Sequence, residues 1–135
     1  MGASGISVFQ DDASLDWLDD YVSSGAGAVA SALDGAAAVP VTEYLDHHQG
    51  AAARTAAEVV ATANGDLPDE ITQDQLATLN THGSDVRAMA GLKSRAKAAL
   101  DRLISENSEL HELWMESDDQ ARWVAAMNDL RRRLG

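Results

Sequence analysis

The stretch DHHQGAAARTAAEVVATANG, residues 46–65, decides the fold. Asp46, followed three residues later by Gln49, has the form of a capping box, in which each side chain accepts a hydrogen bond from the backbone of the other residue. Gly65 stands where a left-handed residue commonly ends a helix. The sequence therefore predicts a helix over about 47–64, and its many alanines allow neighbouring helices to approach closely.

A histidine pair opens this predicted helix. His47 and His48 occupy its first two positions. Consecutive helical positions differ by about 100° around the axis, so the two imidazoles point in different directions. A metal site on a helix uses ligands three or four residues apart. We therefore interpret the pair as the start of a helix and not as a metal site.

Helical periodicity extends over most of the chain. Apolar residues recur near every 3.6 positions from Ala13 onward, and no useful length alternates with the period of a strand. The sequence predicts an all-α, single compact domain of five to seven helices with short loops over residues 1–135, with a glycine- and serine-rich lead segment at 1–10. The first two helices are expected from Asp11 or Asp12 to Val22, with Leu15, Leu18 and Val22 on one side, and from about Ala26 to Ala37.

Polar residues and glycines mark the later boundaries. Thr72 and Gln75 repeat the capping-box pattern, and Gly83 is expected to end that short helix. A long helix is predicted over about 85–106, interrupted by Asn107 and Ser108 before a short segment, ELHELWME. Ser117 is expected to cap the last helix. That helix carries a predicted core stripe at intervals of four, three and four residues: Trp123, Met127, Leu130 and Leu134.

The charge balance is strongly acidic. The 135 residues contain 22 Asp and Glu against 10 Lys and Arg, a formal net charge of -12. No Lys or Arg precedes Arg54, so all eight formal charges of residues 1–53 are negative. Phosphate backbones and anionic membranes attract cations, so we expect no nucleic-acid and no membrane partner. The absence of cysteine and of a recognisable signal sequence favours a cytoplasmic location.

Asp12, Asp16 and either Asp19 or Asp20 can share one face of the first predicted helix. Carboxylate oxygens are ligands for hard divalent cations, but charge runs on a helix usually form its solvated side. Three interpretations therefore stay open: a solvated face, a partner-binding surface and a metal site. A second acidic row resembles the carboxylate rows of helical pyrophosphohydrolases, although it lacks a companion row on another helix: Glu109, Glu112 and Glu116.

Two short motifs imitate known sites without the context that those sites need. GAGAVA, residues 25–30, has the glycine spacing of a dinucleotide-binding turn, but helix-like acidic residues precede it where a strand is required. His111 and Glu112 begin a zinc-protease pattern, but Met115 occupies the position of its second histidine. We therefore predict no cofactor and no catalytic residue.

Charged residues four positions apart predict ion pairs on helix surfaces. The simplest interpretation of Arg54 and Glu58 is a surface or edge pair worth about 0.3 to 0.5 kcal/mol. The three arginines at 131–133 fall at the end of the last predicted helix, where cations favour the negative end of the dipole. Two further surface pairs are expected: Lys97 with Asp101, and Arg102 with Glu106.

The residues FQDDASLDWL, 9–18, resemble the opening signature of a bacterial family, domain of unknown function 4259. Residues 44–61 resemble the middle helix of that family, and residues 108–117 and 123–135 resemble its end. The resemblance implies one helical domain and carries no defined activity. The matching signature positions are Gly2, Gly5, Phe9, Asp12, Asp16 and Trp17, and the departures are Ser4, Asp11 and Ser14.

These observations favour a non-enzymatic protein-interaction or regulatory protein with an immunity-like or inhibitor role. The basic-free first 53 residues would present a negative surface to a basic protein partner, with Asp12, Asp16 and Asp19 as the candidate contact residues. The alternative is a divalent-metal-dependent hydrolase that uses helix-borne carboxylates. The sequence is also compatible with a self-associating homo-oligomer.

Overall fold

The computed structural model describes residues 7–135, which form eight α-helices and one short 3-10 helix. The all-α prediction is confirmed, although the helices are slightly more numerous than expected. The part of the predicted lead segment that contains Gly2 and Gly5 lies outside the described residues. The elements are η2 (Val8–Gln10), α1 (Asp12–Ser24), α2 (Gly27–Ala37), α3 (His47–Ala63), α4 (Gln73–Leu79), α5 (Gly83–Ala88), α6 (Leu92–Leu103), α7 (Glu109–Met115) and α8 (Gln120–Arg133).

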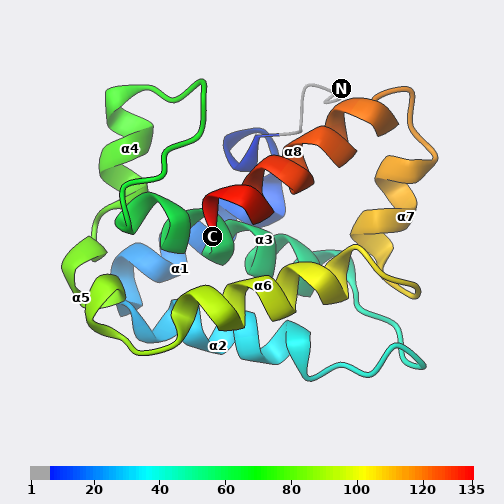
Figure 1. Cartoon of the computed structure of the whole chain (residues 1–135), viewed down its shortest axis with the longest axis horizontal. Helices are drawn as coiled ribbons and strands as arrows, with labels where there is room; N and C mark the ends of the chain where they lie inside the picture. Colours follow the sequence, from blue (N-terminus) through cyan, green and yellow to red (C-terminus); the bar gives the residue numbers. More distant parts are fainter. Residues whose placement is uncertain (1–6) are drawn as a thin grey trace.

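α3 is the centre of the fold. It packs against each of the other seven α-helices, and every residue from Ala53 to Ala63 is buried. A helix that is buried all round needs small or apolar side chains on every face, and the alanines of α3 meet this need. In Figure 1, α2 and α6 run side by side, and α8 crosses the molecule above them.

The predicted start of α3 is confirmed, with Asp46 as its N-cap residue. Asp46 Oδ1 accepts a hydrogen bond of 2.8 Å from the Gln49 backbone, as expected for the first half of a capping box. The next free backbone N–H, that of His47, donates to Glu109 Oε1 of α7 at 3.0 Å. The loop before α3 also pairs with the chain before α7, because Leu45 and Ser108 form an isolated parallel bridge. α7 is therefore tied to the beginning of the central helix.

The buried face of α1 differs from the prediction. Leu18 is buried as expected, but Leu15 and Val22 are 40% and 41% exposed. Tyr21 is buried in their place, and its hydroxyl donates to Leu79 O at 2.8 Å and accepts from His82 N at 3.0 Å. A buried tyrosine needs such partners for its hydroxyl. They join α1 to α4 and α5, and this rotates the aliphatic side chains outward.

The predicted long helix over 85–106 is wrong. Met89 adopts an extended backbone conformation after α5, and Gly91 adopts the left-handed region with φ 73° before α6. Left-handed geometry cannot continue a right-handed helix, and glycine adopts it without steric cost. The chain therefore turns between α5 and α6, so that both helices reach α3.

Two predicted helix boundaries are also wrong. Gly83 begins α5, because the previous helix already ends at Leu79 with Asn80 at its C-cap. Ser117 does not cap α8: its hydroxyl donates to Trp114 O and accepts from the Asp119 backbone, and Asp119 is the N-cap residue. The predicted core stripe of α8 is confirmed, because all four of its members are buried: Trp123, Met127, Leu130 and Leu134.

The two expected surface pairs on α6 do not form. Asp101 pairs with Arg131 of α8 instead of Lys97. Arg102 is buried, and its guanidinium donates to the backbone carbonyls of Val39 at 2.6 Å and Glu43 at 2.8 Å. It contacts Glu106 through the backbone carbonyl of that residue. Arg102 therefore fixes the loop between α2 and α3 to α6.

Candidate functional site

The acidic stripe consists of Asp12, Asp16 and Asp19 on α1. These residues lie at i, i+4 and i+7 of the helix, so they share one face, and all three are exposed. None of them takes part in an ion pair among residues 7–135. The predicted solvated face of α1 therefore exists, and its carboxylates are free of protein cations within this part of the chain.

Two other acids of the basic-free region have side-chain partners. Asp34 on α2 pairs with Arg95 on α6 at 2.5 Å, and Asp11 lies 3.1 Å from His47 Nε2. Burial would raise the pKa of Asp11, but hydrogen bonds from the backbone and hydroxyl of Ser14, together with His47, hold it below its usual value. Asp34 and Asp11 thus have partners of a kind that the acidic stripe lacks among residues 7–135.

Exposed aliphatic side chains border the acidic stripe. Leu15 and Val22 lie on the side of α1 next to Asp19, with about two fifths of each side chain exposed. The outer surface of α1 therefore combines carboxylates with apolar area. That combination is typical of protein-binding surfaces, which join an apolar contact to charged groups around it.

The second acidic row has structural partners. Glu109 accepts the backbone hydrogen bond from the start of α3, and Glu112 Oε1 accepts from the Tyr44 hydroxyl at 2.7 Å. This second hydrogen bond raises the pKa of Tyr44 to about 12. Among residues 7–135, no three His, Cys, Asp or Glu side chains lie close enough together to hold a metal ion. The metal-hydrolase alternative therefore gains no support from the described residues.

A buried charge cluster lies where α3 meets α8. Arg133 Nη2 is 2.6 Å from Glu58 Oε1, and Arg133 Nε donates to Asp129 Oδ2 at 2.8 Å. Arg54, one turn before Glu58 on α3, is also buried. The predicted surface pair of Arg54 with Glu58 is therefore wrong, because both residues are buried and Glu58 is bound by Arg133 instead. Arg133 was expected only as a cation at the negative end of the helix dipole, but it also forms this buried ion pair.

The charges of this cluster influence one another. Burial lowers the pKa of Arg133, but its hydrogen bonds and attraction to Glu58 raise it above the usual value overall. For Asp129, burial acts upward on the pKa, and the bonds from Arg133 and Arg132 bring it below normal. Burial lowers the pKa of Arg54, an effect that the nearby Glu58 partly offsets. The two buried arginines of the cluster therefore differ: the pKa of Arg133 is raised by its partners, whereas the pKa of Arg54 is lowered by burial.

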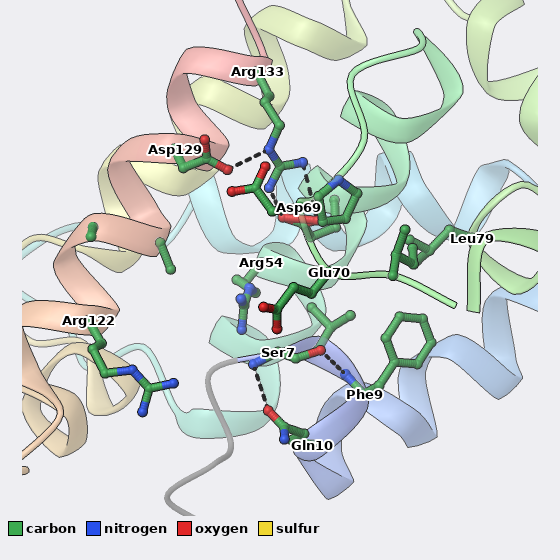
Figure 2. A pocket seen from close by; sticks show the side chains of 16 residues that line it. Ser7, Phe9, Gln10, Arg54, Asp69, Glu70, Leu79, Arg122, Asp129 and Arg133 are labelled. Atoms are coloured by element: carbon green, nitrogen blue, oxygen red, sulfur yellow. Dashed lines mark hydrogen bonds and ion pairs between the residues drawn. The ribbon is translucent and has the colours of Figure 1, made fainter. Parts of the chain in front are cut away.

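The buried charge cluster forms one wall of a pocket of about 480 Å³. η2, the loop before α4 and α8 supply the other walls. Figure 2 shows Arg54 in the wall of the pocket, between Arg133 and Ser7. The lining combines charged with apolar side chains, the latter being Val8, Phe9, Pro68, Ile71, Leu79, Ala125 and Ala126.

A protein-family model matches most of the chain. A family model described as domain of unknown function 4259 (DUF4259) matches residues 2–126. The chain belongs to the DUF4259 family. No curated protein and no solved structure matches it. The DUF4259 match includes the acidic stripe, Arg54 and Glu58, whereas Asp129 and Arg133 follow the matched region.

In this DUF4259 protein, one sequence signal could have revealed the buried charges. Between Gly50 and Ala63, every residue other than Arg54 and Glu58 is Gly, Ala, Val or Thr. A helix that is apolar on all sides is buried, so charges within it must be buried too. Arg133 carried a weaker signal, because it falls three residues after Leu130 of the predicted core stripe. No α-helix in the part of this chain that the structure describes has the length and apolar character needed to cross a membrane.

Proposed function

We propose that this DUF4259 protein is a non-enzymatic interaction or regulatory protein that binds a basic protein partner through the acidic stripe. The observation that carries this proposal is the set of exposed carboxylates at Asp12, Asp16 and Asp19, which have no cationic partner among residues 7–135. Free carboxylates on one face attract a partner with Lys or Arg side chains and accelerate their encounter.

The apolar border defines the partner further. Leu15 and Val22 offer apolar area beside the charges, so the matching surface would carry basic residues around aliphatic or aromatic ones. A protein that covers the basic surface of another protein would act as an inhibitor or an immunity-like protein. This inhibitor role is proposed by analogy with other acidic proteins, and the identity of the captured partner tests it.

The test is a pull-down with crosslinking at physiological salt from a lysate of the source organism. The wild-type chain is compared with a triple variant, Asp12→Asn, Asp16→Asn and Asp19→Asn. The matched control removes the same number of exposed charges elsewhere: Asp74→Asn, Asp85→Asn and Asp118→Asn. We expect capture of a basic protein by the wild type and the control, and at least about tenfold weaker capture by the stripe variant.

Two results would overturn the proposal. One is the recovery of no specific partner by the wild type under conditions in which crosslinking is efficient. The other is equal binding by the wild type and the stripe variant, because the carboxylates would then contribute nothing to recognition. If added salt weakens partner binding by the wild type but not by the stripe variant, this would support the electrostatic attraction between the acidic stripe and the partner.

A further inference from the structure

Arg54 is a buried cation with no hydrogen-bond acceptor among residues 7–135. It is 7% exposed, and its Nε has no hydrogen-bond partner among the described residues. No ion pair joins its guanidinium to another residue of 7–135 either. Leaving such a group unpaired in a protein interior is costly, so an unpaired buried arginine calls for an explanation.

The acids near Arg54 bond to other residues, and neither makes a hydrogen bond to Arg54 among the described residues. Glu58 Oε1 and Oε2 accept hydrogen bonds from Arg133 at 2.6 and 3.4 Å. Asp11 accepts from the backbone and hydroxyl of Ser14, both at 2.9 Å, and contacts His47. Both carboxylates still attract Arg54 over a longer distance, which favours its charged form. The positive charge of Arg54 is thus favoured, while its N–H groups have no acceptor among residues 7–135.

The pocket beside Arg54 has the size and lining of a small-molecule site. Its volume of about 480 Å³ lies within the usual range for ligand pockets, and much of its wall is apolar. A guanidinium presents planar, paired N–H donors that match a carboxylate or a phosphate. Ser7 and Gln10 of the wall carry further polar groups (Figure 2).

The other charges of the pocket limit the ligand. Besides Arg54, its lining contains Arg122 and Arg133, against four acids: Glu58, Asp69, Glu70 and Asp129. The lining as a whole is therefore not cationic, and a polyanion such as a nucleotide triphosphate or a nucleic acid would meet repulsion from the exposed Asp69 and Glu70. A ligand with one anionic group and an apolar body suits both Arg54 and the apolar walls of the pocket.

We propose that this pocket binds a small organic molecule that carries one anionic group, a carboxylate or a phosphate monoester, and that Arg54 holds this group. The site is independent of the proposed partner surface, because no residue of the acidic stripe lines the pocket. The ligand would complete the hydrogen bonding of Arg54 and cover it from water. Arg54 would thus be retained for binding at the expense of stability in the ligand-free protein.

The experiment uses phenylacetate and phenyl phosphate as probes and phenylacetamide as the neutral control. Nitrogen–proton correlation spectra follow the Nε–H signal of Arg54, which is assigned by its loss in Arg54→Met. We expect one anion to shift this signal saturably at concentrations up to about 10 mM, where even a millimolar site is mostly occupied. Phenylacetamide is expected to bind at least about tenfold more weakly. The tighter of the two anions identifies the ligand as a carboxylate or a phosphate.

Variants separate binding from a structural role. Arg54→Met is expected to remain folded, to be at least as stable as the wild type without ligand, and to lose the stabilisation by the anion. Arg54→Lys keeps the charge without the paired donors and is expected to bind at least about tenfold more weakly. Arg131→Met, on α8 outside the pocket, is the control and should bind like the wild type.

Three outcomes would overturn the proposal. The first is the absence of a shift with either anion at these concentrations. The second is equal binding of phenylacetamide, which would show that the charge is irrelevant. The third is an Arg54→Met variant that is strongly destabilised without ligand while Arg54→Lys is not, because Arg54 would then serve the fold. None of these outcomes depends on whether the acidic stripe binds a partner.

Discussion

Arg133 Nη2 and Glu58 Oε1 lie 2.6 Å apart, although the two residues are separated by 75 positions in the chain. Their side chains are only 7% and 6% exposed, so water cannot replace either partner. A buried ion pair gains little over an apolar pair, but the loss of one partner leaves the other ion buried and uncompensated. Glu58 of α3 can therefore be buried at low cost only when α8 is in place to supply Arg133.

Loss of the buried pair should be costly. We expect Arg133→Met to lower the free energy of unfolding by about 3 to 5 kcal/mol, because Glu58 then stays buried without its partner. Urea unfolding followed by circular dichroism measures this change. The control is Arg132→Met, whose side chain is 72% exposed and pairs with Asp129 at the surface, with an expected change below about 1 kcal/mol. Similar losses in both variants would contradict the assigned role of the pair.

The turn between α5 and α6 should depend on a glycine. We expect Gly91→Ala to destabilise the protein by about 1 to 2 kcal/mol, because residue 91 has a φ of 73° and a side chain strains this conformation. Gly35→Ala is the opposite case. Residue 35 is helical with open space around it, and alanine should stabilise it by about 0.5 to 1 kcal/mol. Thermal or urea unfolding of both variants should therefore give changes of opposite sign.

Arg102 should hold the loop between α2 and α3. We expect Arg102→Met to lower the free energy of unfolding by about 1 to 3 kcal/mol for each carbonyl that stays buried without a donor. Hydrogen exchange should accelerate first at the Glu43 amide, which bonds within this loop to Pro40 O. Arg95→Met is the control. The Arg95 side chain pairs with Asp34 at the surface, so its loss should change the free energy of unfolding by less than about 1 kcal/mol. Unchanged exchange at Glu43 in Arg102→Met would count against this role.

The bonds around Asp11 should make stability depend on acid pH. The folded-state pKa of Asp11 is below the ordinary value of 3.8, so its contribution is fully present above that value and is lost as the pH falls toward the folded pKa. Ser14→Ala removes one of the hydrogen bonds that lower this pKa. We expect the carbon NMR titration of the Asp11 carboxyl to move to higher pH in the variant. An identical titration in both proteins would contradict the assigned cause.

Local sequence signals predicted helices better than their ends. The Asp46 cap and the Thr72–Gln75 capping box were predicted correctly because each depends on residues a few positions apart. The break at Gly91 was missed because the apolar spacing on both sides is helical. Tertiary packing against α3 decides that the chain turns there, and no local pattern reports that packing.

In the candidate sites, too, local spacing predicts some features and tertiary packing decides the others. The exposed carboxylates of the acidic stripe follow from helical spacing alone, whereas the side on which Leu15 and Val22 lie depends on the burial of Tyr21. The partner of Glu58 could not be predicted from the rule for residues four apart, which selects Arg54. Its actual partner comes from α8, and only the folded chain brings the two helices together.

The long separation of Glu58 from Arg133 also has a consequence for biosynthesis. The ribosome adds about 5 to 20 residues per second, so Glu58 is made roughly 4 to 15 s before Arg133. Throughout this delay the emerging polypeptide holds a carboxylate whose countercharge has not yet been translated. The alanine-rich segment around it must therefore remain hydrated, or be shielded by a chaperone, until the last arginines have been added.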